Sequence, residues 1–82
     1  MTNTKNQPDQ TFNGHPSWEH WNVSLWLNGV EGLYSLAYEL VVDHGEEKTA
    51  DVLAIVLEGR STPDGAPYSR ELIRYAIRNI AD

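Results

Sequence analysis

Charged side chains are the residues of this 82-residue chain whose types and spacing could do chemistry. Arg70, Arg74 and Arg78 recur every four residues, which places them along one face of a predicted helix. A planar, permanently charged guanidinium at each turn can pair bidentately with carboxylates or phosphates. With Tyr75 as the single interleaved aromatic residue, the stripe is a weak signal for nucleic-acid binding. Ion pairs within the chain or across a dimer are an equal alternative.

The opposite charge is concentrated in the middle of the chain. Residues 31–58 carry seven acidic side chains against a single lysine, Lys48. One interpretation is an acidic face presented to a basic groove on a partner protein, a groove that could normally hold nucleic acid. The alternative is the ordinary solvated side of two amphipathic helices. The residues predicted to form the partner-binding acidic face are Glu39, Glu46, Glu47 and Asp51.

The histidines and serines indicate no catalytic chemistry. His15, His20 and His44 are the available nitrogen ligands, and none stands in an HExxH motif or in a pair at i and i+4. No serine lies in a nucleophile elbow, and the chain has neither a GxGxxG motif nor a phosphate-binding loop. We therefore expect a non-enzymatic protein with no metal and no cofactor.

The overall composition limits which partners the protein can bind and where in the cell it is expected to be. The formal net charge of −6 argues against general affinity for nucleic acid or anionic membranes. The chain has no cysteine, and therefore no disulfide or thiolate site. Its N-terminus lacks the apolar segment of a signal peptide, and no apolar run approaches the length of a membrane span. These features predict a cytoplasmic protein that acts without a membrane.

The elements that must position these side chains are predicted to be helices. Apolar residues recur at spacings of three and four, and Gly, Pro, Ser and Asn mark the breaks between the periodic segments. Residues 52–57, VLAIVL, could form a buried strand, but Ala50, Ala54 and the flanking charged residues favour a helix. The pattern predicts an all-α, compact bundle of four short helices at about residues 17–27, 31–43, 46–58 and 69–80.

Aromatic residues are concentrated in residues 17–38, which contain all three tryptophans. Because so short a chain must bury large side chains to fold, we expect these tryptophans to anchor the core. Residues 1–16 are polar, with Phe12 as their single large apolar side chain, and the composition predicts a flexible tail. Alternatively, Phe12 folds back onto the core or serves as a docking anchor. Residues 17–82 are then expected to form a single helical domain.

Three segments of the chain resemble a family of short, mostly uncharacterised proteins encoded by bacteriophages, plasmids and other mobile elements. They are Ser17-Trp18-Glu19-x-Trp21-Asn22-Val23-x-Leu25-Trp26-Leu27, Glu31-Gly32-Leu33-Tyr34 and Thr62-Pro63-Asp64-Gly65. The resemblance covers about a third of the chain and supplies no catalytic residues. It implies a genomic setting in which small acidic proteins inhibit host defence complexes, as anti-CRISPR and antirestriction proteins do.

Two functions follow as expectations. In the first, the protein blocks a host protein or nucleoprotein defence complex in the host cytoplasm by docking its acidic face on a basic surface. In the second, it is a homodimeric regulatory or structural accessory protein that contacts nucleic acid or phosphate through Arg70, Arg74 and Arg78. The net charge makes the first the stronger expectation, without direct nucleic-acid binding.

Overall fold

Helices account for the regular structure of the computed structural model, which describes residues 12–78 and 80–81. Within these residues the pairing of extended backbone is limited to two isolated bridges, Phe12 with His15 and Ser61 with Pro67, and no strand forms. The predicted all-α class with four helices is therefore confirmed. The helices are α1 (Trp18–Gly29), α2 (Glu31–His44), α3 (Glu46–Val56) and α4 (Arg70–Ile77).

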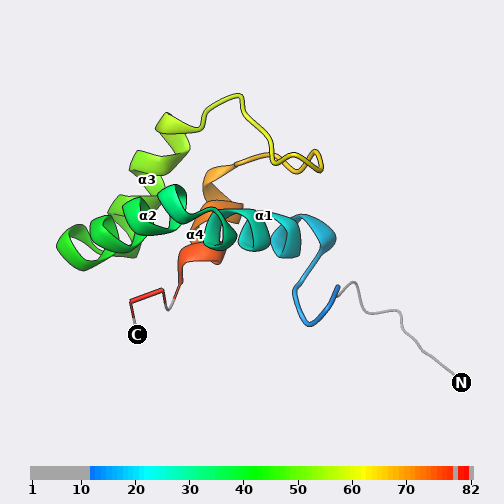
Figure 1. Cartoon of the computed structure of the whole chain (residues 1–82), viewed down its shortest axis with the longest axis horizontal. Helices are drawn as coiled ribbons and strands as arrows, with labels where there is room; N and C mark the ends of the chain where they lie inside the picture. The colour runs from blue at the N-terminus through cyan, green and yellow to red at the C-terminus, as the bar shows by residue number, and fades with distance from the viewer. Residues whose placement is uncertain (1–11, 79, 82) are drawn as a thin grey trace, which may run out of the picture.

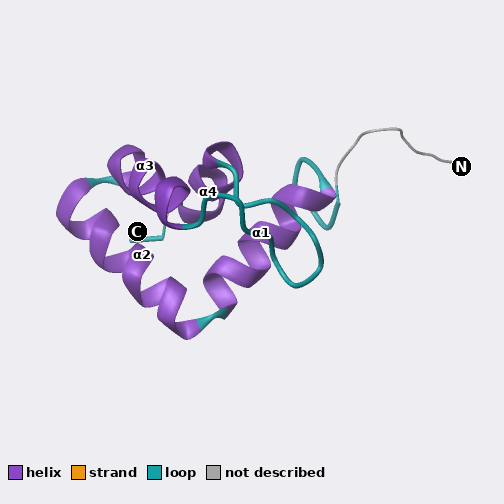
Figure 2. Ribbon diagram, turned by 90° about the horizontal axis from the view of Figure 1, so that it is seen from above, coloured by secondary structure: helices purple, strands orange, loops and turns teal. Residues whose placement is uncertain are grey.

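The four helices are arranged around α4. In Figure 2, α1 and α2 diverge as the arms of a V from the corner at Val30, and α3 and α4 lie on the open side of that V. The short helix α4 packs against both α1 and α3, and α3 packs against α2. Single residues, Val30 and Gly45, separate α1 from α2 and α2 from α3. None of the helices in the described part of the chain has the length and apolar character that a membrane crossing requires.

Serine side chains begin the first and last helices, as their sequences predict. The hydroxyl of Ser17 accepts a hydrogen bond from the backbone N–H of His20, and that of Ser69 accepts one from Leu72. Each bond satisfies one of the backbone donors that the first turn leaves unpaired. These caps fix where α1 and α4 start, and with them the phase of every side chain on both helices.

The core is mostly aliphatic, with Tyr68 as its aromatic member, which corrects the expectation that tryptophans anchor it. Val23 and Leu27 form the buried stripe of α1, whereas Trp18 is 37% exposed and Trp21 and Trp26 are half-buried. Because α1 is apolar around most of its circumference, its sequence periodicity does not reveal which side α4 covers. The buried core consists of Val23, Leu27, Ala37, Ala50, Leu53, Leu57, Ala66, Tyr68, Leu72, Ile73, Ala76 and Ile77.

The loop between α3 and α4 folds back on itself, and in Figure 1 it extends as a yellow arm away from the helices α2 and α3. Ser61 bridges Pro67, and Gly65 donates a backbone hydrogen bond to Thr62 across a turn. The helices flanking this loop are shorter than predicted. Helix α3 ends at Val56 instead of 58, and α4 ends at Ile77 instead of 80. Ile80 still packs on the core, because its N–H bonds the carbonyl of Ile77 in a turn.

The predicted N-terminal tail, residues 1–16, is divided by the structure. Residues 1–11 of that prediction lie outside the described residues. Phe12 and His15, by contrast, exchange two backbone hydrogen bonds of 2.7 and 2.8 Å around Asn13 and Gly14, both of which have positive φ. The ring of Phe12 lies 4.8 Å from that of Trp21. The alternative in which Phe12 folds back onto the helical domain is therefore the one that the structure shows.

Candidate functional site

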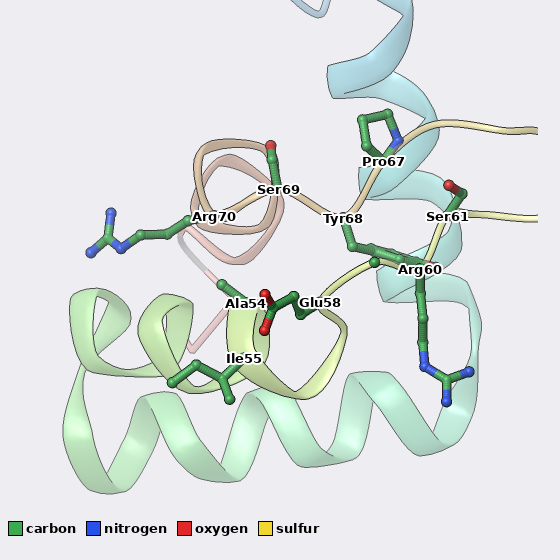
Figure 3. Close-up of a pocket in the computed structure, with 10 residues that line it drawn as sticks. Ala54, Ile55, Glu58, Arg60, Ser61, Pro67, Tyr68, Ser69 and Arg70 are labelled. Atoms are coloured by element: carbon green, nitrogen blue, oxygen red, sulfur yellow. The ribbon is translucent and has the colours of Figure 1, made fainter.

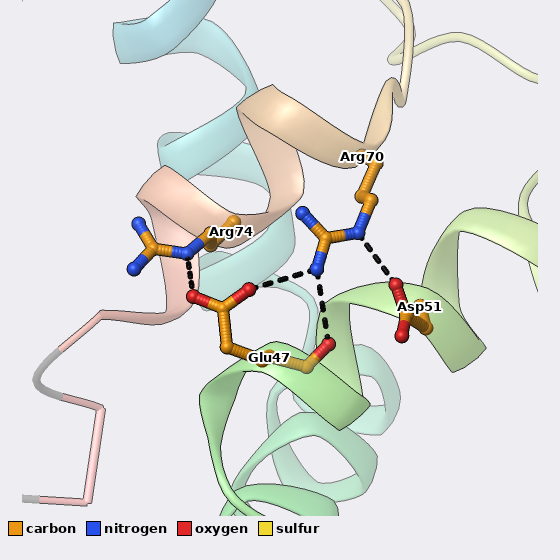
Figure 4. Close-up of polar contacts among 4 residues, drawn as sticks. All are labelled: Glu47, Asp51, Arg70 and Arg74. Carbon is orange, nitrogen blue, oxygen red and sulfur yellow. Dashed lines mark hydrogen bonds and ion pairs between the residues drawn. The ribbon is translucent and has the colours of Figure 1, made fainter.

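The acidic set and the arginine stripe predicted from the sequence meet between α3 and α4. Arg70 donates from Nε to Oδ1 of Asp51 at 2.5 Å and from Nη2 to Oε1 of Glu47 at 2.8 Å. Arg74 donates from Nε to the other carboxylate oxygen of Glu47 (Figure 4). We call these four residues the α3–α4 clamp. Intramolecular pairing, one of the alternatives for the arginines, is thus present.

Pairing in the clamp shifts the pKa values of Glu47 and Arg70 in directions that favour their charged forms. Hydrogen bonds from Arg70, and then from Arg74, lower the pKa of the Glu47 carboxyl below its ordinary value of 4.5. Hydrogen bonds to Asp51, and then to Glu47, raise the pKa of the Arg70 guanidinium. All four side chains are exposed, so solvent screening keeps the energetic worth of the clamp small. The clamp neutralises two members of the predicted acidic face.

The other predicted site residues lie elsewhere. Glu39 is exposed on α2, and Glu46 is half-buried at the start of α3. Arg78 follows α4, where its guanidinium carbon stands 4.3 Å from the centroid of the Tyr75 ring. Among the described residues, neither Glu39 nor Arg78 takes part in the ion pairs of the clamp.

An exposed aromatic and acidic surface runs along α2, and sequence reasoning missed it. Tyr34, Tyr38 and Val42, spaced four residues apart, are 38, 42 and 58% exposed, and the two tyrosine rings lie 6.3 Å apart. Glu39 and Asp43 are exposed next to them along the chain. We call these five residues the open face of α2. Tyr34, Tyr38 and Val42 recur every four residues in the sequence, but that spacing fits a stripe covered by a neighbouring helix equally well.

The sequence of α2 gives this face a single sign of charge. The helix reads EGLYSLAYELVVDH and contains no lysine or arginine. Its buried residue is Ala37, with Leu33, Leu40 and Val41 packed partly against the core. Apart from His44 in its last turn, the helix therefore has no basic side chain that could neutralise the acids of the open face.

Hydrogen bonds attach the loop before α4 to α1 through the segment Thr62-Pro63-Asp64-Gly65. Asn22, buried in α1, donates from Nδ2 to Oδ2 of Asp64 at 2.9 Å and accepts at Oδ1 from the hydroxyl of Thr62 at 2.5 Å. The indole N–H of Trp26 donates to the same Asp64 oxygen at 2.8 Å. Hydrogen bonds from Asn22, and then Trp26, lower the pKa of the Asp64 carboxyl. We call Asn22, Trp26, Thr62 and Asp64 the loop lock.

The histidines are placed by hydrogen bonds and ring contacts. His15 Nδ1 lies 2.7 Å from the hydroxyl of Tyr75, and His20 Nδ1 lies 2.7 Å from the hydroxyl of Ser17. The His20 ring meets the edge of the Tyr75 ring at 4.8 Å. His44 is exposed at the end of α2. Within the residues that the structure describes, no three His, Cys, Asp or Glu side chains come together as a metal site would require.

Two surface hollows lie beside α4. The larger, of about 620 Å³, lies between the end of α3 and the start of α4, and Figure 3 shows Ile55, Glu58 and Tyr68 among its lining residues. Glu58 is its one carboxyl group and no histidine lines it, so it lacks the paired groups of general acid–base catalysis. The smaller, of about 420 Å³, lies between α1 and α4 beside His20 and Tyr75.

Comparisons with known proteins place the chain in a family without assigning a function. Searches among curated proteins and among solved structures found no match. A family described as "Family of unknown function (DUF7249)" matches residues 8–82, which include all four helices and the loop lock. The chain therefore belongs to this family of unknown function, DUF7249.

Proposed function

We propose that this protein is a non-enzymatic protein-binding module that docks the open face of α2 on a basic surface of a partner protein. The observation that carries the proposal is the exposure of Tyr34, Tyr38 and Val42 along one side of a helix that has no lysine or arginine. Exposed aromatic residues in a row are typical anchors of protein interfaces. Next to them, uncompensated acids favour a partner of opposite charge.

The acidic residues of the proposal are Glu39, which the sequence predicted, and Asp43, which it did not. Both side chains are exposed and belong to the open face of α2. Glu47 and Asp51 are hydrogen-bonded to Arg70 and Arg74, so their charge is already paired within the chain. A partner would have to compete with that pairing to use them. We therefore assign the electrostatic steering of the partner to Glu39 and Asp43.

A second copy of the chain fits the open face poorly. Two copies related by a twofold axis would each bring the same acids, Glu39 and Asp43, to the contact. Like charges facing each other across an interface are destabilising. The alternative function, a homodimer that contacts nucleic acid through its arginines, is also weakened, because the net charge of −6 opposes a polyanion and two nitrogens of Arg70 are engaged in the clamp. Light scattering is expected to show a monomer, whereas a dimer that Tyr38→Ser dissociates would contradict the choice of a basic partner.

The resemblance to mobile-element proteins supplies the finer part of the proposal. On that basis the partner is a host defence complex with a basic, nucleic-acid-handling surface, in the cytoplasm of the host cell. Blocking such a surface needs steric cover and complementary charge, and it needs no catalytic group. The open face of α2 has both the apolar anchors and the acidic residues for that role.

Affinity capture with matched variants tests the proposal. The wild type, Tyr38→Ser and Trp18→Ser are immobilised and exposed to lysate of a bacterium that carries defence systems. Tyr38 and Trp18 are aromatic residues with similar exposure, 42 and 37%, on different arms of the V. The proposal predicts a protein retained by the wild type and Trp18→Ser and lost from Tyr38→Ser. Equal retention by all three proteins would contradict it, and a partner that is not a defence complex would contradict its finer part.

A further inference from the structure

The hollow between α1 and α4 collects cationic groups that the proposed docking through α2 does not use. Its volume is about 420 Å³, and it is open to solvent. Helix α4 contributes one side of it and the first turn of α1 contributes His20. The hollow is lined by His20, Arg70, Glu71, Arg74, Tyr75 and Arg78.

The three guanidinium groups of this hollow are held in place by contacts within the chain, and those of Arg70 are with Asp51 and Glu47. Arg74 is anchored to Glu47 through Nε, and in Figure 4 its two terminal nitrogens point away from that carboxylate. The guanidinium of Arg78 lies over the Tyr75 ring at 4.3 Å. The hydroxyl of Tyr75 is in turn bonded to His15 at 2.7 Å, which fixes the ring beneath the arginine. Anchored guanidiniums lose less conformational entropy when they bind a ligand than mobile ones do.

His20 adds an imidazole ring to the lining of the hollow. Its Nδ1 is bonded to Ser17, and its Nε2 lies 3.9 Å from Oε2 of Glu71. Glu71 is exposed, so a ligand anion could replace its carboxylate beside His20. Glu71 is therefore a competitor for the same donors, and its removal should strengthen the binding of an anion.

The donors point to a phosphate group as the ligand chemistry. Terminal guanidinium nitrogens match the spacing of phosphate oxygens, and an imidazole can add a further donor. The hollow accommodates one such group beside Arg74 and Arg78. A nucleic-acid strand would bring many further phosphates against a chain with a net charge of −6 and no other basic patch in this helix pair. We propose that this hollow binds the phosphate of a small phosphorylated ligand.

Amide chemical shifts during titration of the full chain test the proposal. The probes are inorganic phosphate, adenosine monophosphate and a single-stranded oligonucleotide. The expected result is a saturable shift around His20 and residues 71–78 with one of the first two probes. In Arg78→Gln the affinity for that probe should fall about tenfold, because one charge-assisted pair is lost. Glu71→Gln should bind the same probe more tightly than the wild type does.

Arg60→Gln is the matched control. Arg60 is an exposed arginine outside this hollow, and it forms no ion pair with another described residue. It should leave the titration unchanged. Equal weakening in Arg60→Gln and Arg78→Gln, or the absence of a saturable shift with either small probe, would overturn the site. Tighter binding of the oligonucleotide than of both small probes would overturn its assignment to a small ligand.

Discussion

Thr49 and Thr62 are two buried threonines with opposite hydrogen-bonding situations. The hydroxyl of Thr62 donates to Asn22 and accepts from the backbone N–H of Ala66. The hydroxyl of Thr49, fully buried in α3, has no hydrogen-bond partner among the residues that the structure describes. A buried polar group without a partner costs free energy, whereas a paired one contributes when its partners would otherwise be orphaned. The two positions thus allow the same substitution to be compared in opposite contexts.

Replacing each threonine by valine should change the free energy of unfolding in opposite directions. Thr49→Val keeps the shape and removes the unpaired hydroxyl, so stability should stay equal or rise by up to about 1 kcal/mol. Thr62→Val removes the donor to Oδ1 of Asn22 and the acceptor of the Ala66 N–H, and it should cost about 1–3 kcal/mol. Urea unfolding followed by tryptophan fluorescence measures both. A larger loss for Thr49→Val than for Thr62→Val would show that the packing of these hydroxyls is misassigned.

At the scale of the elements, the loop before α4 is fixed on α1 by the loop lock. The lock joins residues about 40 positions apart in the chain, since Thr62 bonds Asn22 at a separation of 40 and Asp64 bonds Trp26 at 38. The Asp64 carboxylate accepts two of these bonds, and both favour its ionised form. The contribution of the loop lock to the stability of the protein should therefore depend on the charge of Asp64.

The lowered pKa of Asp64 sets the direction of a pH dependence. Its contribution to stability is fully present above the unfolded-state pKa, near the ordinary value of 3.8, and is lost as pH falls through the lower folded-state value. Wild type should therefore be more stable than Asp64→Asn at neutral pH, and the difference should shrink below about pH 4. Trp26→Phe removes one of the two donors and should reduce the effect in part. A difference in the melting temperature that is independent of pH would contradict the role of the carboxylate.

The helices and caps of this chain were predictable from local sequence, whereas their mutual placement was not. Ser17 and Ser69 cap their helices as their positions indicate, because a cap depends on neighbours three residues away. The buried side of α1 depends on where α4 packs, and Val23 and Leu27 were indistinguishable from the tryptophans by spacing alone. Asn13-Gly14 did hold a readable signal, since Asn-Gly favours a tight two-residue turn, and it was overlooked.

The candidate site was also predictable from the sequence only in part. The sequence left open that the arginines of α4 pair with acids within the chain. Which acids they pair with, Glu47 and Asp51, depends on the packing of α3 against α4. The open face of α2 could not be read from periodicity, because tyrosines spaced four apart fit a covered stripe equally well. Only the position of the neighbouring helices leaves Tyr38 and Val42 exposed.

At the scale of the whole molecule, charge and apolar exposure are distributed unevenly. The clamp pairs acids and arginines between α3 and α4, while α2 carries its acids without a lysine or arginine of its own. The V of α1 and α2 places Trp18 and Tyr38 on different arms, away from the corner at Val30 (Figure 2). A partner that recognises α2 can therefore be separated experimentally from one that recognises α1.

The central claim is that the open face of α2 is the binding surface of this protein, and the affinity of the captured partner tests it most directly. Isothermal titration calorimetry gives the dissociation constant for the wild type, Tyr38→Ser and Trp18→Ser. Losing an aromatic anchor at the interface should weaken binding at least about tenfold for Tyr38→Ser, with Trp18→Ser close to the wild type. Equal dissociation constants for the two variants, or a loss confined to Trp18→Ser, would contradict the claim.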